Sequence, residues 1–111
     1  MQWIYKFLQA HPKIEYNAFL IEEVHHLLKK DNPSGTALTI ASLLGVDPRS
    51  IKATREGDEL GLHKIALSFD DQEIIVQHRV LNRAVFAKGA LFCVPELVKQ
   101  HPGIYELKKF I

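Results

Sequence analysis

The segment TIASLLGVDPRSIKAT, residues 39–54, has the pattern of two short helices joined at a glycine. Gly45 can adopt the left-handed conformation that commonly ends a helix. Asp47 can accept a free backbone N–H at the start of a second helix, and Pro48 suits its first turn because that N–H needs no partner. The segment therefore predicts a helix–turn–helix corner that spans residues 37–56.

The inner faces of this corner have the residue types that two crossing helices need. Ala41 supplies a small contact, Gly45 supplies the turn and Ile51 supplies an apolar inward residue. This spacing resembles the helix-turn-helix superfamily of DNA-binding proteins, and the resemblance covers about a fifth of the chain. The resemblance implies that the second helix enters the major groove, where its side chains contact bases and phosphates. The residues exposed on that helix would be Arg49, Ser50, Lys52, Ala53 and Arg55.

The flanking segments fit a small winged-helix-like α+β domain, in which helices precede a β-hairpin and C-terminal helical turns follow it. A short helix is predicted from Trp3 to the break at His11-Pro12, and a longer one at residues 17–30, with Glu22 and Glu23 facing water. Alternating apolar residues predict a hairpin at residues 64–80.

A turn at Asp71-Gln72 would place Leu67 opposite Val76 and Ile65 opposite His78 in this hairpin. Residues 84–94 are compatible with either a strand or a helix, and Pro95 is expected to begin a further short helix. No linker or shift in composition divides the 111 residues, so a single domain, 1–111, is expected.

The charge balance limits the kinds of partner that the chain can bind. Fourteen Lys and Arg residues face thirteen Asp and Glu residues, which gives a net charge of only +1. Nonspecific nucleic-acid binding depends on many phosphate contacts, so DNA binding would need one local basic patch, doubled in a homodimer.

The sequence carries no pattern for export or membrane insertion. Cys93 is the only cysteine, which excludes an internal disulfide and multi-cysteine metal motifs, and it is expected to be a buried apolar residue. No run of apolar residues is long enough for a membrane helix, and the first residues do not resemble a signal peptide. We therefore expect a cytoplasmic protein with no membrane partner.

Six histidines raise the question of a metal or cofactor. His25 and His26 are adjacent, and on a helix their side chains would diverge by about 100°, so no metal site and no cofactor are predicted. HHLLKKDN, GDELGL and EIIVQHRV are similar to the C-terminal domain of haem-utilisation proteins related to pyridoxamine-phosphate oxidases. That resemblance implies haem handling with a histidine ligand, although Leu28 and Asp31 stand where that family has an Asn and a second His.

No serine or cysteine lies in a nucleophile motif, and NPSGT lacks the pattern of a phosphate-binding loop, so the sequence predicts a protein that is not an enzyme. The function that the sequence favours is sequence-specific DNA binding in transcription regulation. Two alternatives stay open: a small haem- or ligand-handling module, and a non-catalytic protein-interaction domain. Large apolar residues near both chain ends, including Trp3, Tyr105 and Phe110, motivate the second alternative.

Overall fold

The computed structural model describes residues 6, 9–10, 18–69 and 71–110. The chain divides into two compact units, Met1–Arg79 and Val80–Ile111. Of the short helix predicted before His11-Pro12, only residues 6, 9 and 10 are described, and these are helical.

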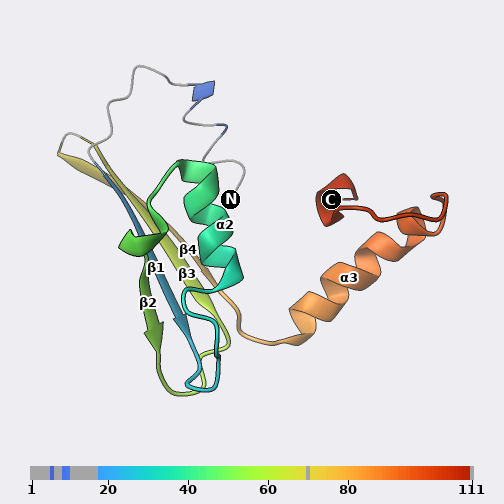
Figure 1. Cartoon of the computed structure of the whole chain (residues 1–111), viewed down its shortest axis with the longest axis horizontal. Helices are drawn as coiled ribbons and strands as arrows, with labels where there is room; N and C mark the ends of the chain where they lie inside the picture. The colour runs from blue at the N-terminus through green and yellow to red at the C-terminus, as the bar shows by residue number, and fades with distance from the viewer. Residues whose placement is uncertain (1–5, 7–8, 11–17, 70, 111) are drawn as a thin grey trace. The chain divides into compact units, whose positions relative to one another are not determined.

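The first unit is a four-stranded mixed sheet with one helix, α2, lying against one of its faces (Figure 1). The strand order is β2-β1-β3-β4, with β1 parallel to β2 and antiparallel to β3, and β3 antiparallel to β4. The elements of this unit are β1 (Ala18–His25), α2 (Gly35–Leu44), the 3₁₀ turn η1 (Pro48–Ser50), β2 (Lys52–Arg55), β3 (Leu62–Phe69) and β4 (Gln72–Arg79).

The helix predicted at residues 17–30 is wrong, because most of this segment forms strand β1. Side chains alternate along a strand, so Phe19, Ile21, Glu23 and His25 share the face that α2 covers. The first two are apolar, but the last two are polar and buried. This change from apolar to polar hides the two-residue period from a search based on hydrophobicity.

The winged-helix-like fold is also wrong, because the second helix of the corner does not form. After Gly45, η1 makes a single turn and the chain then enters β2, which pairs in parallel with β1 from Glu22–Lys52 to His25–Arg55. The edge of β1 offers unpaired backbone groups, and a strand satisfies them where a second helix would not. The predicted end of the first helix is confirmed, since Gly45 has a φ of 67° and closes α2 in the left-handed conformation.

The predicted hairpin is confirmed, but its register differs by two residues. Leu67 pairs with Ile74, Ile65 pairs with Val76, and His63 stands opposite His78. Because side chains alternate with a period of two, a shift of two residues leaves each one on the expected face. The alternation was therefore sufficient to assign the faces, and the turn was misplaced.

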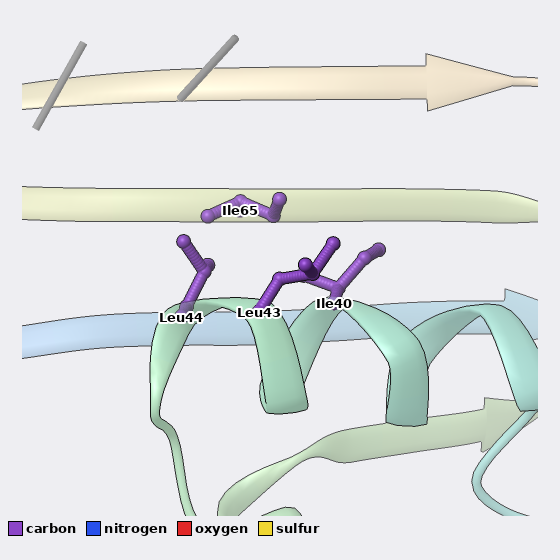
Figure 2. A pocket seen from close by; sticks show the side chains of 4 residues that line it. All are labelled: Ile40, Leu43, Leu44 and Ile65. Carbon is purple, nitrogen blue, oxygen red and sulfur yellow. The ribbon is translucent and has the colours of Figure 1, made fainter. Parts of the chain in front are cut away.

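The core of the first unit lies between α2 and the covered face of the sheet. Ile40, Leu43 and Leu44 of α2 line an apolar recess together with Ile65 of β3, as Figure 2 shows, and this recess has no room for a water molecule. Burial of this kind contributes about 25 cal/mol per Å² of apolar surface, so it is the main force that holds α2 on the sheet. The buried residues of this core are Ile21, Ala37, Ile40, Ala41, Ile51 and Ile65.

The second unit contains the helix α3 (Ala84–Leu97) and the 3₁₀ turn η2 (Leu107–Lys109). The segment 84–94, for which strand and helix both stayed open, is helical, and Pro95 lies inside this helix instead of beginning a new one. The predicted burial of Cys93 is confirmed. Among the described residues, no helix has the length and apolar character needed to cross a membrane.

Candidate functional site

A buried ion pair lies at the polar end of the covered face of the sheet. The carboxylate of Glu23 is fully buried, and both of its oxygens accept hydrogen bonds from the guanidinium of Arg55, each at 2.9 Å. Parallel pairing of β1 with β2 places these two residues on the same face, two positions apart in the register, since Arg55 stands opposite His25. The pairing is bidentate, the geometry in which guanidinium and carboxylate bind most strongly.

Two further groups donate to the same carboxylate. The Nδ1 of His25 donates to Oε2, and the backbone N–H of Ser34 donates to Oε1 at 2.9 Å. Burial raises the pKa of Glu23, but the hydrogen bonds from Arg55, Ser34 and His25 outweigh burial and leave the pKa below its ordinary value. The carboxylate is therefore ionised at neutral pH.

Ser34 connects this cluster to the first turn of α2. It is the N-cap residue, and its Oγ accepts the N–H of Ala37 at 3.2 Å and lies 3.0 Å from Nε2 of His63. Burial lowers the pKa of His63, as does the nearby His25, whose ring centroid is 5.1 Å away. The Nε2 of a neutral His63 can accept a hydrogen bond from the hydroxyl of Ser34, which gives both groups a partner.

The loop between β1 and α2, residues 26–34, brings cationic groups to the N-terminal end of this helix. The Nζ of Lys29 lies 2.8 Å from the carboxylate of Asp31. The hydrogen bond from Lys29 is the main cause that lowers the pKa of Asp31, and the backbone N–H of Gly35 contributes as a further donor. Arg55 also binds the backbone of this loop, because its Nη2 donates to the carbonyl of Asp31. A carboxylate thus already lies between an ammonium group and a helix N-terminus.

Glu23, His25 and His63 could in principle hold a metal ion, since one ligand atom from each lies within 4.8 Å of the others. However, both oxygens of Glu23 bind the guanidinium of Arg55, whose positive charge neutralises the carboxylate. A divalent cation would have to displace these hydrogen bonds beside a fixed positive charge, which is unfavourable. The donor set fits a hydrogen-bonded network better than a metal centre.

The whole chain, residues 1–111, matches the protein family described as "Dihydrodipicolinate reductase, C-terminus". The chain belongs to this family. A 4-hydroxy-tetrahydrodipicolinate reductase of Bdellovibrio bacteriovorus is 43% identical over 105 residues, which cover 91% of this chain and 46% of that protein. The enzyme of the same name from Methanosarcina acetivorans is 36% identical over 105 residues, which cover 78% of this chain and 40% of that protein.

A solved structure with the same fold is a dipicolinate-bound dihydrodipicolinate reductase from Paenisporosarcina. It aligns with a TM-score of 0.72 and 20% identity over 98% of this chain and 50% of that one. The chain therefore spans about half the length of the relatives it matches.

Membership of this family overturns the predicted function. The relatives are reductases, so the predictions of DNA binding, transcription regulation and a DNA partner are wrong. The prediction that the protein is not an enzyme is contradicted as well, because these relatives are enzymes. The relatives named are not haem-utilisation proteins, and the resemblance to that family is not retained.

The five residues chosen for DNA contact do not form one helical face. Arg49 and Ser50 lie in η1. Arg49 forms an ion pair of 2.7 Å with the Asp47 carboxylate, and the hydroxyl of Ser50 donates to the backbone carbonyl of Asp47 at 2.7 Å. Lys52, Ala53 and Arg55 lie in β2, where alternation sends Lys52 to one face and the other two to the opposite face. Lys52 pairs with Glu22 at 3.1 Å. Of the five, only Arg55 belongs to the buried cluster.

Sequence reasoning missed the other members of the cluster. Glu23 was expected to face water beside Glu22, yet Glu22 pairs with lysines on the opposite face while Glu23 is buried. A usable signal was present: His25, Lys29 and the Ser34 cap occur within a dozen residues of one another, before a helix. The segment matches neither a phosphate-loop pattern nor a metal-site pattern.

Proposed function

We propose that this chain is the substrate-binding half of a 4-hydroxy-tetrahydrodipicolinate reductase, and that the loop 26–34 with the N-terminal turn of α2 binds a carboxylate of the substrate. The family and the names of its relatives support the reaction. The contacts of the Asp31 carboxylate with Lys29 and with the N–H of Gly35 support the location. The chain spans about half the length of these relatives. We therefore propose that the complete reaction also needs the part of the enzyme that this chain does not span.

The observation that favours this location is the position of the Asp31 carboxylate. It is half-exposed, it pairs with the Nζ of Lys29 at 2.8 Å, and it receives the N–H of Gly35. A carboxylate of the chain itself thus occupies the kind of position that a substrate carboxylate needs. A bound dicarboxylate would compete with Asp31 for Lys29 and for the helix end.

The N-terminus of α2 suits an anion for a general reason. The first four N–H groups of a helix have no acceptor within that helix, and the helix dipole favours negative charge there. Ser34 satisfies the N–H of Ala37, whereas Gly35 and Thr36 are exposed and point their N–H groups toward the helix end. Lys29 and the exposed Lys30 add two positive charges to the adjoining loop. A ring with two carboxylates matches this arrangement better than a neutral ligand does.

The reductant is a separate matter. A reductase needs an electron donor, and the sequence contains no glycine-rich fingerprint of the kind that binds a dinucleotide. We therefore assign the reductant to the part of the relatives' length that lies outside this chain. Within this half, the residues bind and orient the substrate and supply positive charge beside it.

Isothermal titration calorimetry of the chain with dipicolinate tests the proposal. We expect binding that weakens as salt is added, because two charges are paired, and weaker binding of picolinate, which has one carboxylate. Lys29→Ala should reduce the affinity about tenfold or more, since a charge-assisted hydrogen bond contributes about 1.5–3 kcal/mol.

Lys52→Ala is the control, because Lys52 is another lysine in an ion pair with a carboxylate but lies on the opposite face of the sheet. Equal affinity of dipicolinate and picolinate, or equal loss in the two lysine variants, would contradict this location.

A further inference from the structure

We propose that Glu23 is the positioning residue of this site: one buried carboxylate fixes both the ring of His25 and the loop that begins α2. The inference rests on the proposed function only in treating this loop as part of a ligand site. The hydrogen bonds of Glu23 that position these groups are present in the chain without any ligand.

The hydrogen-bond count on Glu23 determines where the proton of His25 lies. Arg55, Ser34 and His25 together give this carboxylate four contacts, two on each oxygen. An ionised carboxylate can only accept hydrogen bonds, so Nδ1 of His25 must carry a proton. When the imidazole is neutral, Nε2 is then the nitrogen with the free lone pair. Glu23 therefore selects one tautomer of a ring at the end of β1, next to the loop.

Arg55 makes this selection robust. The guanidinium cannot lose its proton, and its side chain is 12% exposed, so a permanent positive charge lies against the carboxylate in a dry environment. Its Nη1 also donates to the carbonyl of Thr54 at 2.8 Å, which ties the pair to β2. Glu23 stays ionised because of this neighbour, and its role as an acceptor is fixed for the same reason.

The second function of Glu23 concerns the backbone. Its Oε1 accepts the N–H of Ser34, the residue that caps α2, while Arg55 Nη2 binds the carbonyl of Asp31 three residues earlier. The loop is therefore held at two points by one ion pair. His63 adds a third point through the hydroxyl of Ser34. The ring of His25 and the backbone at the start of α2 are consequently positioned by the same charge.

Nitrogen-15 NMR of the imidazole rings tests this inference on the ligand-free chain at about pH 8, where an ordinary histidine is neutral. We expect Nδ1 of His25 to be the protonated, pyrrole-type nitrogen and Nε2 to be the pyridine-type nitrogen. In Glu23→Gln the Nδ1–H signal should be lost or become a mixture of both tautomers, and the backbone N–H of Ser34 should shift upfield as its bond to a charged acceptor is lost. Glu22→Gln is the control, because this neighbouring carboxylate lies on the opposite face and pairs with Lys52 and Lys64.

The wild-type spectrum alone can overturn the inference, even if Glu23→Gln does not fold, because an unprotonated Nδ1 is incompatible with it. An unchanged His25 tautomer in a folded Glu23→Gln variant overturns it too, since Glu23 would then only stabilise the fold. Failure of dipicolinate to bind the wild-type chain would contradict the proposed function and leave this reading of the ring nitrogens intact.

Discussion

Replacing Arg55 by methionine should destabilise the chain far more than the same replacement at Arg49. Both arginines make bidentate pairs with a carboxylate, Arg55 with Glu23 and Arg49 with Asp47. The two pairs differ mainly in exposure. The Arg55 side chain is 12% exposed and its partner is fully buried, whereas the Arg49 side chain is 90% exposed.

The expected magnitude follows from this difference. Breaking a buried pair by removing one partner costs about 3–5 kcal/mol, because the other charge is left without compensation. Glu23 keeps its hydrogen bonds from Ser34 and His25, so we expect a value near the lower end, about 3 kcal/mol. Methionine fills a similar volume with apolar atoms, so the packing around the side chain contributes little to this loss.

Urea unfolding followed by circular dichroism measures the effect. For a domain of this size, a slope of about 1.5 kcal/mol per molar urea converts 3 kcal/mol into a midpoint that is lower by about 2 M. The Arg49→Met midpoint should match that of the wild type. If the two variants shift the midpoint equally, or if Arg55→Met lowers it by less than about 0.5 M, the buried pair does not support the fold in the way described.

Three further predictions concern the same unit. The pKa of His63 is lowered in the folded chain, so the unfolded chain binds a proton first as the pH falls. The contribution of His63 to the free energy of unfolding should therefore be complete above about pH 6.5 and decline below it. In urea titrations at each pH, His63→Gln should flatten that decline between about pH 6.5 and 5. Ser34→Ala should cost about 2 kcal/mol of unfolding free energy, because it removes both the cap on Ala37 and the partner of His63, and a loss below about 0.5 kcal/mol would show that the cap is not in place. Gly45→Ala should cost about 1 kcal/mol through backbone strain alone, since a Cβ there meets no atom within 4 Å; an unchanged urea midpoint would argue against the left-handed conformation at this position.

Local sequence rules predicted those parts of the fold that local interactions determine. Gly45 ends α2 and residues 64–80 form the hairpin, because a glycine at positive φ and a period of two are properties of short segments. The pairing of β2 with β1 could not be predicted from the sequence, because it joins residues about thirty positions apart and β2 has only four residues. Tertiary pairing here outweighed a local pattern that favours a helix.

The site escaped prediction because its chemistry depends on burial. Glu23 and His25 look like surface residues in a sequence, since charged side chains are seldom buried without partners. Their partners lie in other strands: Arg55 in β2, a segment whose local pattern favours a helix, and His63 in β3, whose pairing with β1 no local pattern indicates. A buried carboxylate on a strand is recognisable only when the guanidinium that neutralises it can be placed beside it.

The most direct test of the whole account is a titration of the nitrogen-15-labelled chain with dipicolinate, observed through its backbone amide signals. We expect saturable shifts that are largest at Gly35 and Thr36 and extend to Lys29, with little change along Arg49–Arg55. Shifts that centre on Arg49–Arg55, or amide signals that stay unchanged at every concentration of dipicolinate, would contradict the assignment of the α2 N-terminus as the carboxylate site.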